Sequence, residues 1–294
     1  MTVINKKNEC PPFLIAPGLR IVLLFLSWVL GSILMLFVSL LLNNGSNQDA
    51  MMRISVVVQD VLMWVVPAIV TAMIVTRRPA RLLAIDCLPS MRQTLLAIFL
   101  LIVSTPLMSW IINFNSTIHL PESLSMLETN LRAMEDASQK AVESLLATTS
   151  PLGIVVNILI IGLLAGFSEE LFFRGALQRI LASSNMSVHA AIWISAIVFS
   201  ALHFQFFGFI PRMLLGATFG YLLLWSGSVW LPMLIHALNN TAYVVFFTTT
   251  GSGEPSLDGA ASSWVGIAVS CALTIATLVA LAKSSKSDRQ NLPV

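Results

Sequence analysis

The sequence contains little charge: Asp, Glu, Lys and Arg make up 10% of its 294 residues, whereas apolar residues make up 56%. Soluble globular domains carry about 25% charged residues, so the composition excludes that class of protein. The net charge is only +2, which excludes the strongly basic surface typical of nucleic-acid-binding proteins. We therefore expect a membrane protein with no nucleic-acid partner.

The sequence is also poor in cysteine and lacks several catalytic motifs. Its three cysteines, Cys10, Cys87 and Cys271, are widely separated and fit neither a zinc-ligand spacing nor a disulfide framework. An H-E-x-x-H motif is absent, which argues against a zinc-protease helix, and no serine lies in a G-x-S-x-G elbow. Asp60 is the only aspartate inside a long apolar run, so an aspartyl pair within the membrane is excluded as well.

Long apolar runs are abundant. A helix needs about 20 apolar residues to cross the hydrocarbon core. The first run is longer than the core of a signal peptide, about 7–15 residues, so we expect it to be retained. We predict an all-α, polytopic transmembrane helical bundle that forms a single membrane domain over residues 1–294. Its eight predicted spans lie at 21–42, 54–76, 94–112, 152–173, 188–206, 209–226, 229–247 and 264–282.

Basic residues are distributed unequally between the two sides of this predicted bundle. If the N-terminus is cytoplasmic, the opposite side carries four basic residues, Arg53, Arg132, Lys140 and Arg212. The cytoplasmic side then carries eleven, namely Lys6, Lys7, Arg20, Arg77, Arg78, Arg81, Arg92, Arg179, Lys283, Lys286 and Arg289. Cytoplasmic loops are enriched in Lys and Arg, so we predict that both termini are cytoplasmic.

One loop on the extracytoplasmic side has the pattern of an amphipathic helix. Over residues 122–147, leucine, methionine and valine side chains recur near helical spacing, with glutamate and aspartate between them. This segment is predicted either to lie on the bundle as a structural cap or to act as a lid or substrate-docking element.

Ionisable and amide side chains lie inside three of the predicted spans. Each charged group at bilayer depth costs about 2.5–3.5 kcal/mol on the insertion scale, so such groups indicate function. Asp60 and Arg212 lie near the predicted outer ends of their spans, where they would reach water. The remaining candidates are Glu169, Glu170 and Arg174 in the fourth span, His203 in the fifth, and His236 and Asn240 in the seventh.

Helical spacing assigns these candidates to faces. Glu170 and Arg174 are four residues apart and are predicted to form a buried pair, which leaves Glu169 to face a cavity. His236 and Asn240 are also four apart and could supply two hydrogen-bond donors to an oxyanion. The structural alternatives are a packed histidine at His203 and interhelical hydrogen bonds from His236 and Asn240.

Three motifs carry a family resemblance. Glu169 to Arg174 reads E-E-x-x-x-R, Phe199 to His203 reads F-x-x-x-H, and His236 to Asn240 reads H-x-x-x-N. In this order the sequence resembles the CPBP family (CAAX protease and bacteriocin-processing, or Abi), which includes the type II CAAX prenyl proteases. The resemblance covers about residues 150–245, the predicted catalytic core.

The resemblance implies a glutamic-type intramembrane endopeptidase without a cofactor. Glu169 and His203 would activate the attacking water, Glu170 and Arg174 would support the site, and His236 with Asn240 would hold the oxyanion. Its substrate would be a membrane-embedded or lipid-anchored peptide or protein. The short loops are typical of a bacterial protein of the inner membrane, for which a prenylated CAAX substrate is not expected.

Other functions would use the same polar groups. Glu169, His203 and His236 could hold a divalent metal with one open position, which would make the enzyme a zinc-dependent protease. A transporter or ion-binding module could bind an ion there, although the polar groups lie only in the second half of the chain and no internal symmetry is visible. A scaffold protein could also retain the centre without catalysis.

Overall fold

The protein is an all-α helical bundle in the computed structural model, which describes residues 12–42, 48–148, 150–184, 186–251 and 263–290. Lys6, Lys7 and Cys10 lie outside the described residues. Within them every regular element is a helix, apart from an isolated bridge between Phe13 and Thr76. The predicted fold class is confirmed.

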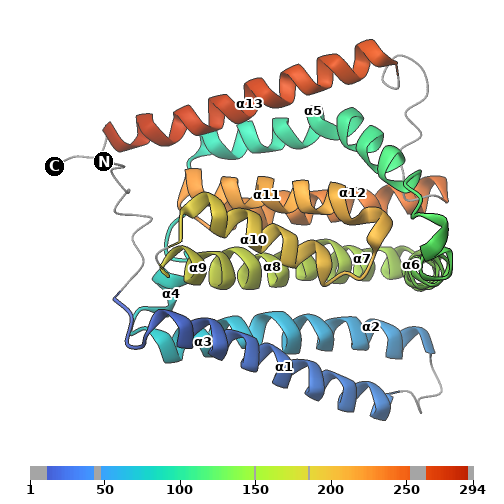
Figure 1. Cartoon of the computed structure of the whole chain (residues 1–294), viewed down its shortest axis with the longest axis horizontal. Coiled ribbons are helices and arrows are strands. Elements are labelled where there is room, and N and C mark those ends of the chain that lie inside the picture. The colour runs from blue at the N-terminus through green and yellow to red at the C-terminus, as the bar shows by residue number, and fades with distance from the viewer. Residues whose placement is uncertain (1–11, 43–47, 149, 185, 252–262, 291–294) are drawn as a thin grey trace.

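The helices form three layers (Figure 1). One outer layer pairs α1 (Pro17–Leu42) with a long helix built from α2 (Gln48–Gln59), the π-helical η1 (Asp60–Val65) and α3 (Val66–Val75). The other outer layer pairs α5 (Met91–Ser116) with α13 (Trp264–Gln290). The short α4 (Pro79–Leu82) links the two layers along the chain.

The middle layer carries the three motifs. Its first helix is continuous over Pro151–Ala182. It comprises α7 (Pro151–Asn157), the π-helical η3 (Ile158–Leu164), α8 (Ala165–Glu170), the π-helical η4 (Leu171–Gln178) and α9 (Arg179–Ala182). The remaining helices of this layer are α10 (Val188–Ala201), α11 (Phe209–Ser226) and α12 (Trp230–Thr250), with the 3-10 turn η5 (Phe206–Gly208) before α11.

Six helices in the described residues are long and apolar enough to cross a membrane. Large apolar side chains face outward on them, for example Leu30 (67% exposed) and Ile102 (64% exposed). Because water would make such surfaces unfavourable, they fit a lipid environment. The chain is an integral membrane protein.

The other two predicted spans differ from this pattern. α12 has 21 residues, but its histidine and asparagines make it less apolar than the six. α10 has only 14 residues, so the prediction of a spanning helix over 188–206 is wrong at its C-terminal end. His203 therefore lies beyond the helix rather than inside it.

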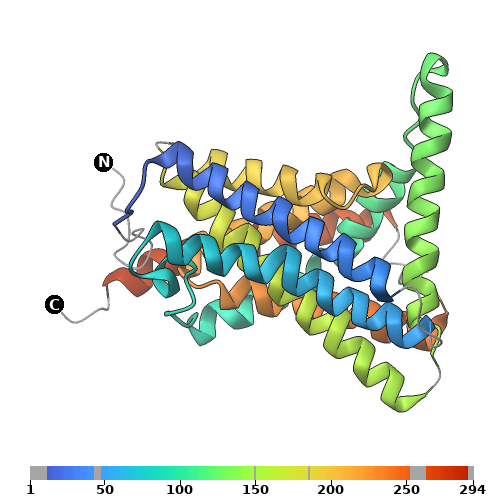
Figure 2. The same cartoon turned by 90° about the horizontal axis from the view of Figure 1, so that it is seen from below.

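The ends of the bundle are distinct. α1 begins and α13 ends at one end, whereas α6 (Ser125–Leu146) lies at the other and runs across the direction of the spans (Figures 1 and 2). The start of α1 and the end of α13 thus share one end of the bundle, and the cytoplasmic location of the termini stays a prediction.

The amphipathic helix predicted over 122–147 is confirmed as the 3-10 turn η2 (Glu122–Leu124) followed by α6. Glu128 ties its first turn to the preceding loop: its carboxylate accepts hydrogen bonds from the Leu120 N–H (2.7 Å) and from Arg132 Nε (2.9 Å). His119 Nδ1 lies 2.8 Å from the same carboxylate. The backbone N–H of Leu120, followed by Arg132 and His119, lowers the pKa of Glu128 to about 2.

We expect Glu128→Gln to loosen the start of α6 at neutral pH. A carboxyl whose pKa is lowered in the folded state contributes stability above its unfolded pKa and loses it as the pH falls through the folded pKa. Hydrogen exchange of the Leu120 amide should therefore be faster in the variant at pH 7, and the difference should shrink as the pH approaches about 2. Asp136→Asn, at an exposed position of α6, is the matched control. Equal exchange rates in wild type and Glu128→Gln at pH 7 would contradict this assignment.

Candidate functional site

The two glutamates lie on α8, the short α-helical stretch between π-helical η3 and η4. π-helical segments are frequent at functional sites. Gly166 on α8 faces the backbone of α12, and a Cβ added there would lie 2.8 Å from the Ala237 nitrogen. The absence of a side chain at Gly166 therefore lets α12 approach α8 closely enough for His236 to reach the glutamates.

Arg174 is fully buried and forms the centre of the polar group. Its Nη1 donates to Glu170 Oε1 at 2.7 Å, and its Nη2 donates to the Gly216 carbonyl at 2.8 Å. The guanidinium carbon lies 4.6 Å from the Phe199 ring centre and 5.3 Å from that of Phe219. The Glu170–Arg174 pair predicted from their spacing is confirmed.

His236 shares Glu170 with the arginine. Its Nδ1 lies 2.8 Å from Glu170 Oε1, and because a carboxylate paired with an arginine only accepts hydrogen bonds, Nδ1 is the donor. The other ring nitrogen, Nε2, lies 3.8 Å from Glu169 Oε2. The imidazole stacks on Phe219, with ring centres 4.8 Å apart. His236 is thus held between the two carboxylates.

His203 reaches the site from the turn after α10. The His203 N–H donates to the Ser200 carbonyl, and Phe204 then adopts a left-handed φ of 54°, which ends the helix. Nδ1 lies 2.7 Å from the Phe199 carbonyl. A carbonyl can only accept, so Nδ1 carries the proton and Nε2 of the neutral ring is a free acceptor.

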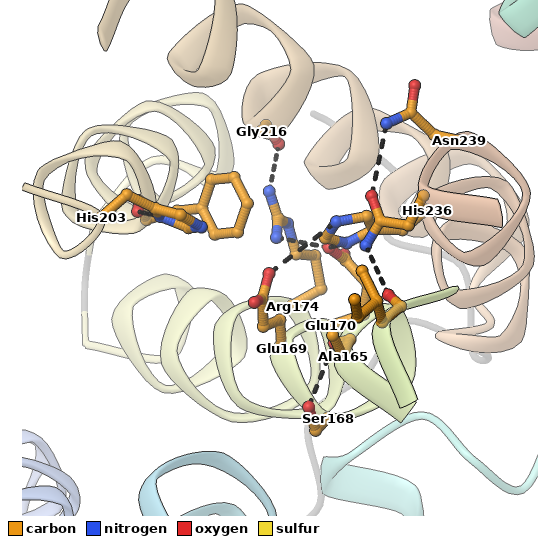
Figure 3. Close-up of polar contacts among 12 residues, drawn as sticks. Ala165, Ser168, Glu169, Glu170, Arg174, His203, Gly216, His236 and Asn239 are labelled. Carbon is orange, nitrogen blue, oxygen red and sulfur yellow. Dashed lines mark hydrogen bonds and ion pairs between the residues drawn. The ribbon is translucent and has the colours of Figure 1, made fainter. Parts of the chain in front are cut away.

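The two histidines lie on either side of one aromatic ring. The Phe199 ring centre is 4.8 Å from that of His203 and 6.0 Å from that of His236. Figure 3 shows His203 and His236 approaching from opposite sides, with Glu169 and Arg174 on the central helix between them. Four of the predicted residues thus form one hydrogen-bonded or ion-paired group: Glu169, Glu170, Arg174 and His236. His203 lies on the other side of the Phe199 ring from His236.

Asn240 forms an interhelical hydrogen bond, as the structural alternative to an oxyanion role predicts. Its amide nitrogen donates to the Ile161 carbonyl at 3.3 Å, and its amide oxygen accepts from Asn239 at 3.4 Å. One N–H of Asn240 therefore links α12 to η3. Only its second N–H is left to serve as an oxyanion donor beside His236.

Two charged residues that the sequence pattern placed near water lie beside this group instead. Asp60 is 3% exposed, and its carboxyl lies near Ser168, whose hydroxyl donates to the Ala165 carbonyl. The prediction was wrong because the helix begins at Gln48, so Asp60 lies about 18 Å inside it. Arg212 is only partly exposed and lies close enough to Glu169 and His203 for their charges to interact. The sequence already shows both residues as charges in or beside apolar runs, and this signal alone would have kept them among the candidate site residues.

A metal was the alternative reading of the site. Among the described residues, no three His, Cys, Asp or Glu side chains are grouped so that they could hold a metal ion. His203 and His236 are separated by the Phe199 ring, which explains why the glutamate and the two histidines do not form such a group. Metal independence itself stays a prediction.

Comparison with known proteins agrees with the motifs. Residues 151–242 match the family model described as type II CAAX prenyl endopeptidase Rce1-like. This segment contains all three motifs, so the predicted resemblance is confirmed, and at the family level it indicates a CAAX-type protease.

A curated relative is also similar over this part of the chain. The chain is 28% identical over 93 residues to the uncharacterized protein YpbD of Bacillus subtilis (strain 168), which covers 30% of this chain and 44% of that protein. The chain thus spans less than half the length of this relative. No solved structure matches the chain.

We expect Gly166→Ala to impair the site. The added methyl group would collide with the backbone of α12 and push His236 away from Glu169, at a cost of about 1–3 kcal/mol for overpacking. Thermal unfolding in detergent should show a lower midpoint than in the wild type. Gly18→Ala is the control because a Cβ there meets nothing within 4 Å. Equal midpoints for the two variants would show that the α8–α12 contact is not as tight as the structure indicates.

Proposed function

We propose that this chain is an intramembrane endopeptidase that hydrolyses a peptide bond in a membrane-embedded or lipid-anchored peptide or protein. The observation that carries the proposal is the division between the two glutamates: Glu170 forms an ion pair with Arg174, whereas the ion pair of Glu169 among the described residues is with His236. A structural ion pair needs only the first glutamate. Glu169 is not needed for that pair. Together with His203, whose Nε2 can accept a hydrogen bond, it has the composition of a site that activates water.

Hydrolysis would begin with a water molecule between Glu169 and His203. The Glu169 carboxylate takes a proton from this water, and the free Nε2 of His203 accepts its other hydrogen bond and orients it. The water oxygen then adds to the scissile carbonyl carbon, which becomes tetrahedral while the carbonyl oxygen becomes negative.

The oxyanion would be held from α12. His236 donates through Nδ1 to Glu170, so its Nε2 can donate to the oxyanion only when the ring is an imidazolium, whose charge the oxyanion itself would offset. The second N–H of Asn240 would be the other donor. When the intermediate collapses, the C–N bond breaks, and the proton held by Glu169 passes to the leaving nitrogen. The products are a carboxylic acid and an amine, and transfer of the acid's proton to the amine gives a carboxylate and an ammonium group.

Cleavage should depend on Glu169 and His203. General acid–base groups contribute about 10²- to 10⁴-fold to a rate, so Glu169→Gln and His203→Ala should each lower kcat by that factor. The measurement is cleavage of a library of transmembrane peptides by purified protein in lipid vesicles, read by mass spectrometry. Asp86→Asn, at an exposed position between α4 and α5, should cleave like the wild type. Retained cleavage in both catalytic-site variants would refute this mechanism.

Cleavage should not depend on a divalent metal. Water activation by Glu169 needs no Lewis acid, so dialysis against a strong chelator should leave kcat unchanged. The measurement compares chelated protein with the same protein after zinc is restored. Loss of activity that zinc restores would favour the zinc-dependent alternative.

A further inference from the structure

A groove lies between α6 and the turn that follows α10, the turn that carries His203. Its volume is about 260 Å³. Leu131 and Met134 of α6 form one wall, and Ala201, Phe204 and Phe206 are on the other. Ala201 and Phe204 flank His203 in sequence, so the groove and the histidine share one short stretch of chain.

α6 is fastened to this stretch by several contacts. Glu135 accepts a hydrogen bond from the Phe207 N–H at 3.0 Å, and the Arg132 guanidinium lies 3.7 Å from the centre of the Phe207 ring. Gln205 donates to the Ser138 hydroxyl at 3.3 Å. These contacts keep the wall formed by α6 at a fixed distance from the turn, so the groove is a built feature of the fold.

Phe204 is held in an unusual conformation at the edge of the groove. Its φ of 54° lies in the left-handed region, which is unfavourable for a residue with a side chain. Despite its size the side chain is 68% exposed. An exposed aromatic ring on strained backbone next to a catalytic-site residue points to a role in binding.

We propose that this groove binds an apolar side chain of the peptide substrate next to the bond that is cut. The inference rests on the proposed function. Sites that enclose a whole small molecule have volumes of about 300–1,000 Å³, and this groove is smaller, as one side chain requires. Its walls are aliphatic and aromatic, with Gln205 and Ser200 as polar lining residues, so an aliphatic or aromatic side chain fits its chemistry.

A peptide is favoured over a lipid chain as the occupant. The turn that lines the groove also carries His203, where the proposed mechanism places the scissile carbonyl, and neighbouring residues of an extended peptide are only about 3.3 Å apart. On one side the groove is bounded by α6. Glu135 of α6 accepts a hydrogen bond from the Phe207 N–H, and Arg132 of α6 lies over the Phe207 ring. A peptide held at His203 would thus present the next side chain to Met134.

Filling the groove should change which peptides are cut. We expect wild type, acting on a random library of transmembrane peptides in vesicles, to prefer Leu, Met or Phe at one position beside the cleaved bond. Met134→Trp should move this preference toward Ala and Gly, with a change of roughly 10- to 100-fold in the ratio of kcat/KM values. Met126→Trp, on the same helix at a site that is 79% exposed, should leave the preference unchanged. An identical preference in all three proteins would overturn the proposal while the proposed function stands.

Binding can also be read without turnover. Glu169→Gln protein should cross-link to a transmembrane peptide that carries a benzophenone residue, and the adduct should map to Leu131 or Met134. Adducts only with a benzophenone-labelled phospholipid would assign the groove to lipid and overturn the proposal. If the peptide cross-links at these residues but wild type cleaves nothing, the groove binds peptides and it is the proposed hydrolysis that fails.

Discussion

The buried charge of Arg174 is the constraint on which the rest of the site depends. An uncompensated guanidinium inside an apolar bundle would be strongly unfavourable, so partners must come to it from several helices. Glu170 provides a countercharge one helical turn away, Gly216 provides a backbone carbonyl from α11, and Phe199 provides an aromatic face from α10. Because Glu170 also accepts from His236 on α12, this one ion pair sets the relative positions of four helices.

The same ion pair explains why adjacent glutamates can differ in role. Glu170 is fully enclosed and has both a cation and an imidazole as partners, whereas the Glu169 side chain keeps 15% of its surface exposed. Successive residues on a helix point about 100° apart, so one packs against the core while its neighbour faces the histidines. His203 depends on a different support, the turn that α6 holds from the end of the bundle. The site therefore combines a rigid half on helices with a half that rests on a loop.

Sequence reasoning found what local spacing determines. The i,i+4 rule predicted the Glu170–Arg174 pair, and periodicity predicted α6. It did not predict that α10 ends early, before the left-handed Phe204, and it could not tell that the Ile161 carbonyl accepts one N–H of Asn240. Asp60 was misplaced because the polar residues at the start of α2 hid the true length of its helix. No pattern in the sequence shows which backbone group will approach a side chain from another helix.

The π-helical segments on either side of α8 have a consequence for how this helix tolerates change. Adding or removing one residue in a regular helix rotates everything beyond it by about 100°, which would turn the glutamates away from the histidines. A π-helical turn holds one residue more than an α-helical turn and can absorb such a shift locally. Because η3 and η4 lie on either side of α8, a one-residue insertion or deletion in the outer parts of the helix can be absorbed in them. Glu169 and Glu170 would then still face α12.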